Sequence, residues 1–432
     1  MCKQVLKHLL LTLFIILCSV LSSCSVSAKH SNNSNPVNVQ RVSYKRLGKI
    51  KYGKIIITKE IDLKGAVCEI PHKYTLVFKG GSIKNGSLFG NNTKISYVDQ
   101  IFNHVKILGS WNVPQISTSM FVDLDYENSL QSVFSLANPE VNNSIIIESG
   151  EYVVTAFHNG EKVLTVVSNT DVEINGIIRL KPNDFTNYGI LYLHGEHITI
   201  HGNGTVIGDK HTHTGTKGEW GMGVSIHECS NVNVSGIKIQ DCWGDCIYIG
   251  TKSTDVVIDG CTLTHGRRQG ISITSANDVV VRNCLIKNVG GTAPEYAIDL
   301  EPNHDDIVDN ILIDGVKVVN CKGGFCAYGT ANGASIGSIT IRNCDVTAEE
   351  KMTIAMVKCG TVLIEKNTLV RKNDNRVIAC DQIGNIIVQN NILKYKSKST
   401  TGDKKAVKSS LGAVTAFNCG KRTVEGNREL KN

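Results

Sequence analysis

The chain has 432 residues, 46 Lys and Arg against 39 Asp and Glu, and a formal net charge of +7. This basic excess is modest, so it fits a polyanionic glycan partner and ordinary solubility alike. After the first two dozen residues no segment is apolar for long enough to cross a bilayer, which excludes a further membrane span.

Residues 1–23 are typical of a secretory signal peptide. A basic start precedes an apolar run from Leu9 to Leu21, too short for a membrane span. The segment Leu21-Ser22-Ser23-Cys24 resembles a bacterial lipobox, which would make Cys24 the lipidated first residue of the mature protein. An ordinary signal peptide cut nearby is the alternative. We therefore predict a cell-envelope protein, periplasmic or surface-exposed, held to a membrane only by its N-terminal lipid. Export argues against nucleic acid as a partner.

Residues 24–52 are rich in Ser, Asn, Lys and Val without a strong period, which predicts a flexible spacer. Residues 53–432 are longer than a usual compact domain. A solenoid grows by adding coils, so we expect a single domain there, with N-terminal strands and a cap in 53–150 and regular coils in 151–432.

Short alternating runs between residues 55 and 95 predict strands separated by Gly-Ser and Gly-Asn turns. In NSLQSVFSLANPE, a short helix beginning at Asn128 or Ser129 would place Leu130, Val133 and Phe134 on one face. A strand, a Gly turn and another strand follow. This arrangement resembles the N-terminal cap of pectate-lyase-like right-handed β-helix proteins, where it covers the open edge of the first coil.

A motif with an inward aliphatic residue, two turn residues and one ladder residue returns about every 24 residues. Such a period predicts an all-β chain folded as a right-handed parallel β-helix, a solenoid with a short N-terminal capping helix. The motif occurs as ITIHGN ending at Asn203, VNVSGI at Ile237, VVIDGC at Cys261, VVVRNC at Cys284, ILIDGV at Val316, ITIRNC at Cys344, VLIEKN at Asn367, IIVQNN at Asn391 and RTVEGN at Asn427.

Three of the twelve cysteines that follow Cys24 occupy the ladder position, namely Cys261, Cys284 and Cys344. Adjacent coils lie about 4.8 Å apart, within the range that a disulfide tolerates. Stacked parallel side chains suit packing better than bridging, so we predict free, buried thiols. No cysteine or histidine spacing indicates a zinc site.

The repeats also align the strands that follow the ladder residues. Aliphatic side chains alternate into the core, so the intervening residues should form two columns facing solvent. The first column is Tyr192, Ser225, Tyr248, Ser272, Asp299 and Cys326, and the second is His194, His227, Gly250, Thr274, Glu301 and Tyr328. Aromatic, hydroxyl, imidazole and carboxylate groups on one face favour a ligand groove over an ordinary solvated face.

Asp299 and Glu301 lie two residues apart on one strand, with Cα atoms about 6.5 to 7 Å apart. Paired carboxylates can serve as acid and base in glycoside hydrolysis. Arg267 and Arg268 are the orienting or charge-stabilising candidates, because arginine can clamp a sugar carboxylate with two hydrogen bonds. The alternative is a purely structural carboxylate pair neutralised by these arginines.

Further candidates surround this pair. Asp245 precedes its strand and either faces the groove as a catalytic group or caps a turn. Trp243 either stacks on a sugar or packs locally. The remaining predicted substrate contacts are His194, His227, Tyr248, Ser272, Thr274 and Tyr328.

The reaction is predicted to require no cofactor. Asp299, Glu301, Asp305 and Asp306 carry hard oxygen ligands, so Ca²⁺ is an open alternative. Their spacing matches no recognised calcium loop, and we assign no residue as a metal ligand.

The stretches GDCIYIG, RRQGISI and PEYAIDLEPN resemble a run in bacterial and phage proteins of the pectate-lyase-like superfamily. The resemblance covers residues 241–304 at the level of motifs. It implies carbohydrate binding and often polysaccharide cleavage, with Asp299 and Glu301 matching the acidic strand and Arg267 and Arg268 the basic pair. The Arg-Ile-Lys signature of polygalacturonases and the Trp-x-Asp-His of pectate lyases are missing from this sequence, and Asn169-Thr170-Asp171 lies outside the stretch that carries the resemblance.

We therefore predict an extracytoplasmic protein that binds and cleaves a polysaccharide, one that could contain uronic acid. Glycoside hydrolase and polysaccharide lyase both stay open. The alternative is a non-catalytic glycan-binding or structural β-helix lipoprotein.

Overall fold

The computed structural model describes residues 40–431 except 97, 123–128, 159, 375 and 396–411. From Arg41 onward the chain forms one compact unit, Arg41–Asn432. The predicted signal peptide, the lipidation of Cys24 and the spacer up to residue 39 lie outside the described residues. Within the described part of the chain, no helix has the length and apolarity needed to cross a membrane.

The first part of this unit is an eight-stranded sheet in which only β2 and β3 pair in antiparallel fashion. Its strands are β1 (Arg41–Ser43), β2 (Lys49–Lys51), β3 (Lys54–Ile57), β4 (Ile61–Asp62), β5 (Val67–Glu69), β6 (Thr75–Phe78), β7 (Ile83–Ile95) and β8 (Phe102–Asn112). A short 3-10 helix, η1 (Tyr44–Leu47), joins β1 to β2.

The prediction that the spacer extends to residue 52 is therefore wrong. Strand β1 pairs with β5, and Leu47 at the end of η1 is buried in the core. Apolar residues scattered among lysines concealed these short elements, and the partner of β1 lies 26 residues further along the chain, where Arg41 pairs with Val67.

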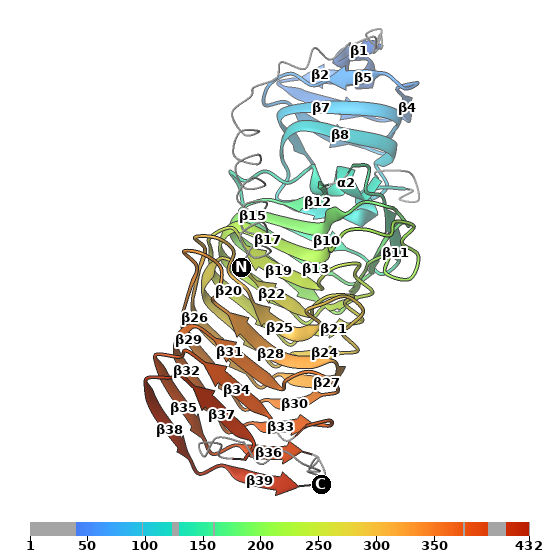
Figure 1. Cartoon of the computed structure of the whole chain (residues 1–432). Helices are drawn as coiled ribbons and strands as arrows, with labels where there is room; N and C mark the ends of the chain where they lie inside the picture. Colours follow the sequence, from blue (N-terminus) through green and yellow to red (C-terminus); the bar gives the residue numbers. More distant parts are fainter. Residues whose placement is uncertain are drawn as a thin grey trace, which may run out of the picture. The chain divides into compact units, whose positions relative to one another are not determined.

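The predicted short helix is present as α2 (Ser129–Phe134), with Leu130, Val133 and Phe134 buried. Its expected place at an open end of the stack is wrong. The helix contacts β8 on one side and β11 and β12 on the other, so it lies between the first sheet and the coils that follow (Figure 1). The helix does contact strands that pair on one side only, β11 with β14 and β12 with β15, but the first sheet lies beyond it.

Regular coils fill the rest of the chain, and each contributes two strands to one continuous set and a third to a separate sheet (Figure 1). The first set contains β9 (Gln115–Ser117), β10 (Asn143–Ile147), β12 (Glu161–Val166), β13 (Thr170–Ile174), β15 (Asn187–Gly202), β17 (Trp220–Ser235), β19 (Ile247–Gly250), β20 (Ser253–Asp259), β22 (Ile271–Ile273), β23 (Ala276–Arg282), β25 (Tyr296–Leu300), β26 (Ile307–Asp314), β28 (Gly323–Tyr328), β29 (Ser335–Arg342), β31 (Ile354–Val357), β32 (Cys359–Glu365), β34 (Ile378–Asp381), β35 (Asn385–Gln389), β37 (Val414–Phe417) and β38 (Lys421–Glu425).

The separate sheet has eleven parallel strands. They are β11 (Glu151–Val154), β14 (Ile177–Leu180), β16 (Thr205–Ile207), β18 (Lys238–Gln240), β21 (Thr262–Thr264), β24 (Leu285–Lys287), β27 (Lys317–Cys321), β30 (Asp345–Ala348), β33 (Thr368–Arg371), β36 (Ile392–Tyr395) and β39 (Arg428–Lys431). A second 3-10 helix, η2 (Thr118–Met120), follows β9.

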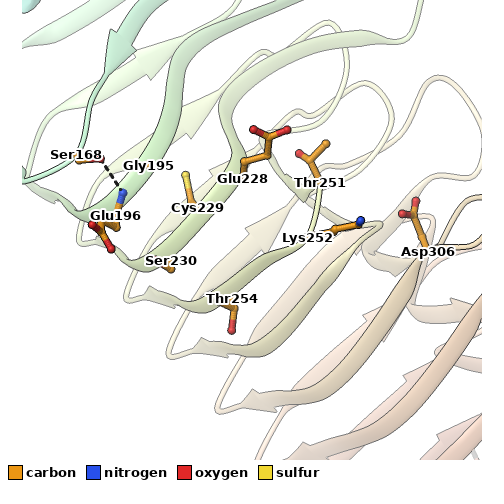
Figure 2. A pocket seen from close by; sticks show the side chains of 10 residues that line it. All are labelled: Ser168, Gly195, Glu196, Glu228, Cys229, Ser230, Thr251, Lys252, Thr254 and Asp306. Atoms are coloured by element: carbon orange, nitrogen blue, oxygen red, sulfur yellow. Dashed lines mark hydrogen bonds between the residues drawn. The ribbon is translucent and has the colours of Figure 1, made fainter. Parts of the chain in front are cut away.

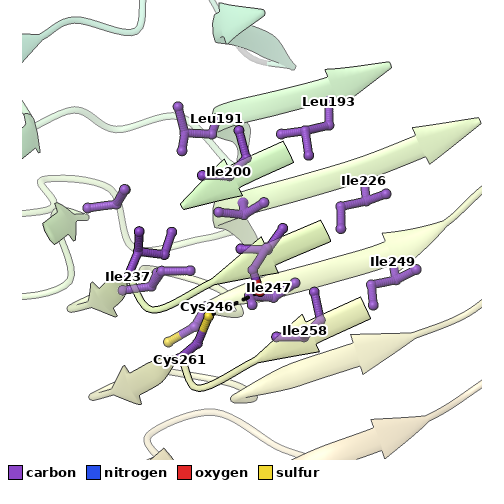
Figure 3. Close-up of a cluster of buried hydrophobic side chains, with 14 of the residues drawn as sticks. Leu191, Leu193, Ile200, Ile226, Ile237, Cys246, Ile247, Ile249, Ile258 and Cys261 are labelled. Carbon is purple, nitrogen blue, oxygen red and sulfur yellow. Dashed lines mark hydrogen bonds between the residues drawn. The ribbon is translucent and has the colours of Figure 1, made fainter. Parts of the chain in front are cut away.

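The interior of the coils is filled by stacked aliphatic side chains. Leu193, Ile226 and Ile249 are in register on successive coils and are fully buried (Figure 3). Because every coil presents the same alternation, each added coil buries its aliphatic residues against those of the previous coil.

The ladder positions from Ile237 to Asn391 are buried, whereas Asn203 is exposed and Asn427 is partly buried. All twelve cysteines among the described residues are free and buried, which confirms the expectation of thiols over disulfides. Asparagines replace them in the last coils, where Nδ2 of Asn367 donates to Asn391 Oδ1 at 2.9 Å. Asn391 repeats the bond to Asn427 at 2.9 Å. These side chains satisfy backbone groups at the corner that the strands leave unpaired.

Candidate functional site

Strand register confirms both predicted columns. Residues of the first column pair in the predicted order from Tyr192 to Cys326, and in the second column His194 pairs with His227 and His227 with Gly250. Ile298 and Leu300 belong to the core, so Asp299 between them points away from it.

The expectation that the first column is open to solvent is only partly correct. Ser225, Ser272, Asp299 and Cys326 are all buried. The reason lies in the residues just before each strand. Arg268 contacts the Asp245 carboxylate to which Ser272 donates, and Gln269 bonds Asp299, so longer side chains close over the shorter ones.

The open part of this face is a pocket of about 680 Å³. Six of the predicted residues line it, namely His227, Tyr248, Arg268, Ser272, Thr274 and Glu301. The other predicted site residues are not among its lining residues: His194, Trp243, Asp245, Arg267, Asp299 and Tyr328.

An aromatic wall borders one side of the pocket. The rings of Tyr192 and His227 stack with centroids 4.8 Å apart, and the tilted ring of Tyr248 lies 5.0 Å from His227. The hydroxyl of Tyr248 shares a 2.8 Å hydrogen bond with Thr274 Oγ1. The ammonium of Lys162 lies 4.1 Å from the centroid of the Tyr192 ring. The spacing between the rings follows from the distance between coils, since the three residues come from successive coils.

The imidazole of His227 is uncharged at neutral pH. Burial lowers its pKa to about 4, and the positive charge of Lys162 acts in the same direction. Its Nδ1 lies 3.0 Å from the hydroxyl of Thr251, which holds the ring in place. A neutral, stacked imidazole can accept a proton or a hydrogen bond from a ligand.

Arg268 joins three carboxylates at the other side of the pocket. Its Nε lies 3.2 Å from Glu219, its Nη1 lies 3.7 Å from Asp245 and its Nη2 lies 3.7 Å from Glu301. Glu219 belongs to the segment before β17, Asp245 to the turn before β19, and Glu301 directly follows β25. One guanidinium thus gathers acids from three coils and is not left to clamp a sugar carboxylate.

Asp245 is a fully buried carboxylate beside the pocket. Ser272 Oγ donates to its Oδ2 at 2.8 Å, while Oδ1 is buried without a hydrogen-bond partner. Burial raises the pKa of Asp245 to about 6, and the nearby charge of Arg268 limits the rise. An unpartnered buried oxygen is costly, so a bound water or a ligand group is needed to satisfy it.

Asp299 does not reach the pocket, which corrects its predicted role as an exposed acid or base. It is 1% exposed, and Gln269 Nε2 donates to its Oδ2 at 2.5 Å while Cys326 Sγ lies 3.0 Å from its Oδ1. Burial raises its pKa to about 7, and the negative charges of Glu301 and Asp245 contribute further. Asp299 can act on the pocket only through its neighbours.

Arg267 and Trp243 form a local packing unit, so their predicted roles in the groove are wrong. The Arg267 guanidinium lies 3.6 Å from the Trp243 ring centroid, and its Nε donates to the Trp243 carbonyl at 2.5 Å. Its other nitrogens donate to Thr292 and to the Gly218 carbonyl. On its other face Trp243 stacks on His213 at 3.9 Å. The stack fastens the segment before β17 to the coils.

Two other predicted contacts lie outside the pocket. His194 is exposed, with Nδ1 3.2 Å from the carbonyl of His227. Tyr328 packs against Tyr296 and Cys326 in a small apolar cluster. Their columns are correct, but the pocket does not extend that far along the face.

Sequence reasoning missed several lining residues, among them Lys162, Tyr188, Trp220 and Met222, and it gave no role to Tyr192. Lys162 pairs with Gly189, three residues before Tyr192, so it lies outside both columns, and extending them by one coil would have given Thr165 instead. Trp220 is 50% exposed at the start of β17. Nothing in the repeat marks it, because the segment before β17 has no counterpart in the neighbouring coils.

Among the described residues, no group of three or more His, Cys, Asp or Glu side chains is arranged to hold a metal ion. Asp299 is buried against Gln269 and Cys326, whereas Asp305 pairs with His304 at 2.6 Å. Calcium therefore stays an open alternative that gains no support from this geometry.

A second hollow of about 650 Å³ lies at the adjoining corner of the coils (Figure 2). Glu196, Glu228, Lys252 and Asp306 are among its lining residues, together with several hydroxyl groups. It has no aromatic lining residue on which a sugar face could stack, so the pocket around Arg268 is the better candidate site.

Residues 183–338 match the family model described as the right handed beta helix region. The match spans the coils that carry the pocket, and it confirms the predicted right-handed parallel β-helix.

Two curated relatives come from Bacillus subtilis (strain 168). The uncharacterized protein YclG is 29% identical over 214 residues, which are 43% of this chain and 36% of the relative. The SPbeta prophage-derived uncharacterized protein YorA is 25% identical over 351 residues, or 73% of this chain and 56% of the relative. The chain thus spans about a third and somewhat over half of the lengths of these two relatives.

Several solved structures are similar. The A-module of mannuronan C-5 epimerase AlgE4 from Azotobacter vinelandii has a TM-score of 0.48 and 13% identity over 70% of this chain and 93% of its own. A tailspike mutant of E. coli bacteriophage HK620, in complex with a pentasaccharide, has a TM-score of 0.49 and 11% identity over 74% of this chain and 67% of its own. An exopolygalacturonase from Thermotoga maritima has a TM-score of 0.45 and 14% identity over 71% of this chain and 86% of its own. Such identities concern the fold and not the chemistry.

Proposed function

We propose that the protein binds a polysaccharide in the pocket around Arg268 and cleaves it by hydrolysis. The observation that carries this proposal is the pair Asp245 and Glu301 on one guanidinium. One carboxylate is buried with an unpartnered oxygen and a raised pKa, and the other is exposed in the pocket. Two carboxyl groups in different environments are what glycoside hydrolysis requires of its acid and its base.

Binding would use the aromatic wall. Trp220 is half-exposed at the rim, and Tyr192 and Tyr248 line the side of the pocket. Flat apolar rings suit the faces of sugar rings, while Thr274, Asn303 and Asn187 offer hydrogen bonds to hydroxyl groups.

In the proposed reaction Glu301 acts as the base or nucleophile. Its carboxylate lies 3.7 Å from Arg268, and half of its side chain is open to the pocket. Protonated Asp245 supplies the proton to the leaving oxygen through the hydroxyl of Ser272, which lines the pocket 2.8 Å from Asp245 Oδ2; in this step the hydroxyl accepts from Asp245 instead of donating to it. A proton leaves Asp245 as Ser272 gives its own to the sugar, so the hydroxyl is restored. Asp299 is a positioning residue behind this relay.

Hydrolysis is favoured over elimination because the arginines are occupied. Arg267 is hydrogen-bonded to backbone carbonyls, and the charge of Arg268 is already balanced by three carboxylates at 3.2 to 3.7 Å, so neither arginine is favoured to neutralise a uronate. One observation supports elimination as a second candidate. Lys162 contacts only the Tyr192 ring among its recorded partners, and uncharged His227 beside it could remove a proton.

Incubating the purified protein with a panel of bacterial and plant polysaccharides, both neutral and uronic, tests the proposal. We expect new reducing ends without the ultraviolet absorbance of an unsaturated uronic product. Reducing ends with that absorbance would favour the lyase. Glycan binding without release from any polysaccharide would favour a non-catalytic binding protein.

Replacing Trp220 by Ala should weaken oligosaccharide binding about tenfold, because one stacked aromatic ring contributes about 1.5 kcal/mol. Stability should change little, since the ring is 50% exposed. Calorimetric titration with a bound oligosaccharide measures the change. Phe417, which is 49% exposed in the last coils, gives the matched control Phe417→Ala, expected to bind normally. Equal affinity of Trp220→Ala and the wild type would exclude this platform.

We also propose that the protein is held in the cell envelope by a lipid on Cys24, as the lipobox-like sequence suggests. The variant Cys24→Ala should move the protein from the membrane fraction to the soluble fraction on cell fractionation. An unchanged membrane fraction would contradict lipidation at this residue.

A further inference from the structure

Positive charge is concentrated in the first sheet. Residues 41–112 contain thirteen Lys and Arg against four Asp and Glu, whereas residues 113–432 contain 30 against 35. All of the thirteen except Lys84 are exposed. The modest net charge of the chain therefore conceals one strongly basic part and one slightly acidic part, and such asymmetry points to an anionic partner.

Four of these lysines surround one exposed aromatic residue. Tyr52, at the tip of the β2–β3 hairpin, is 90% exposed, and Lys51 and Lys54 flank it as a cross-strand pair. Lys54 is in register with Thr75, and Thr75 with Lys94, so Lys94 lies two strands away, or about 10 Å. Lys73 precedes the Tyr74-Thr75 pair, and Thr75 donates to the carbonyl of Gly53. We call Lys51, Tyr52, Lys54, Lys73 and Lys94 the basic tip.

No carboxylate neutralises the basic tip in the described part of the chain. The ion pairs of the first sheet join Arg41 to Glu69 and Lys84 to Glu60, away from these lysines. The ammonium of Lys51 lies 5.3 Å from the centroid of the Tyr52 ring. A tyrosine that is 90% exposed packs little in the folded protein, so its place among four ammonium groups, which no carboxylate of the described residues pairs, fits a partner with both anionic and apolar groups.

We propose that the basic tip docks the protein onto an anionic phospholipid surface. Lysines would lie against the headgroup phosphates, and Tyr52 would enter the interface, where amphipathic aromatic rings are favoured. A soluble polyanion would pair with the lysines but would offer no apolar contact to the exposed ring. One acyl chain gives only marginal membrane attachment, and a polybasic surface is a common second signal. The tip would serve as that signal for a lipid on Cys24, yet it does not depend on the pocket or its chemistry.

Vesicle co-sedimentation of the mature chain carrying Cys24→Ser, and therefore lacking any lipid, tests the proposal. We expect binding to phosphatidylcholine vesicles that contain phosphatidylglycerol, no binding to phosphatidylcholine alone, and loss of binding at high salt. Each lysine near the surface accounts for about a fivefold change, so Lys51→Gln with Lys54→Gln should weaken binding about 25-fold. Tyr52→Ser should weaken binding severalfold without changing its salt dependence.

The matched control is Lys317→Gln with Lys366→Gln, two exposed lysines of the later coils, which should bind like the parent. Equal weakening by both double variants would overturn the proposal in favour of nonspecific charge attraction. Absence of binding to the anionic vesicles would overturn it as well. Binding that is unaffected by Tyr52→Ser and abolished by soluble dextran sulfate would assign the tip to a polyanionic glycan instead. Circular dichroism of each variant excludes unfolding as the cause.

Discussion

Replacing Glu301 by Gln should lower polysaccharide cleavage on the order of 1,000-fold while glycan binding persists. Glutamine keeps the shape of the side chain and its hydrogen bonds but can neither take a proton nor attack a sugar carbon. The side chain is 50% exposed and contacts Arg268 at 3.7 Å, so its replacement should not unfold the coil. Release of reducing ends measures cleavage, and titration with the same glycan measures binding.

Glu350 offers a matched control for this variant. Its side chain is 61% exposed and lies 3.8 Å from the ammonium of Lys322, much as Glu301 lies beside Arg268. Glu350→Gln should therefore cleave the glycan at the wild-type rate. Retained activity in Glu301→Gln would remove the central carboxylate of the proposed reaction. Loss of both binding and thermal stability would show instead that Glu301 is structural.

Asp299→Asn should make the protein more stable than the wild type above pH 7, by about 4 kcal/mol at pH 8. The folded state holds this carboxyl with a pKa of about 7, because it is buried, against about 3.9 in an unfolded chain. Asn is neutral at every pH and can still accept the hydrogen bond from Gln269. The variant thus avoids the cost of a buried charge.

The sign of this effect depends on pH. A raised carboxyl pKa means that the folded state binds more protons than the unfolded state between about pH 4 and pH 7. The free energy of unfolding from this group therefore falls as pH rises through that window and is fully retained below it. His227 acts in the opposite direction over part of the window, because its pKa is lowered to about 4. The difference between wild type and variant cancels this contribution.

Thermal unfolding at pH 4, 6 and 8 measures the difference, which should be near zero at pH 4 and largest at pH 8. Asp305→Asn provides the control. The side chain of Asp305 is 71% exposed, so the stability of this variant should follow that of the wild type at all three pH values. Parallel pH dependence of wild type and Asp299→Asn would show that the Asp299 carboxyl is not held protonated by burial. A functional cost is compatible with this gain, because catalytic sites often retain destabilising groups.

The sequence predicted the fold and the columns well because both follow from local periodicity. The repeat places one ladder residue per coil, and alternation by two along each strand separates core residues such as Ile298 from outward residues such as Asp299. The register from Tyr192 to Cys326 follows from these two periods alone. Tyr248, His227, Arg268 and Glu301 were therefore placed in the pocket without any coordinates.

Periodicity did not predict what covers each outward residue. Arg267 and Arg268 are adjacent, yet one is stacked on Trp243 and the other faces the pocket. Their difference depends on the segment before β17, whose Gly218 carbonyl and Glu219 carboxylate bind them respectively. That segment interrupts the repeat, so its position could not be aligned with any other coil.

By itself the sequence determined that this chain winds into coils and which side chains leave the core, because strand alternation and coil stacking are set by neighbouring residues. Only the tertiary structure decided which of these outward groups meet solvent. Asp245 and Asp299 are covered while Glu301 is open, since burial depends on side chains contributed by other coils and by the irregular segments between them. Desolvation then sets two of three chemically similar carboxylates apart, because burial raises the pKa values of Asp245 and Asp299 while Glu301 stays half exposed in the pocket.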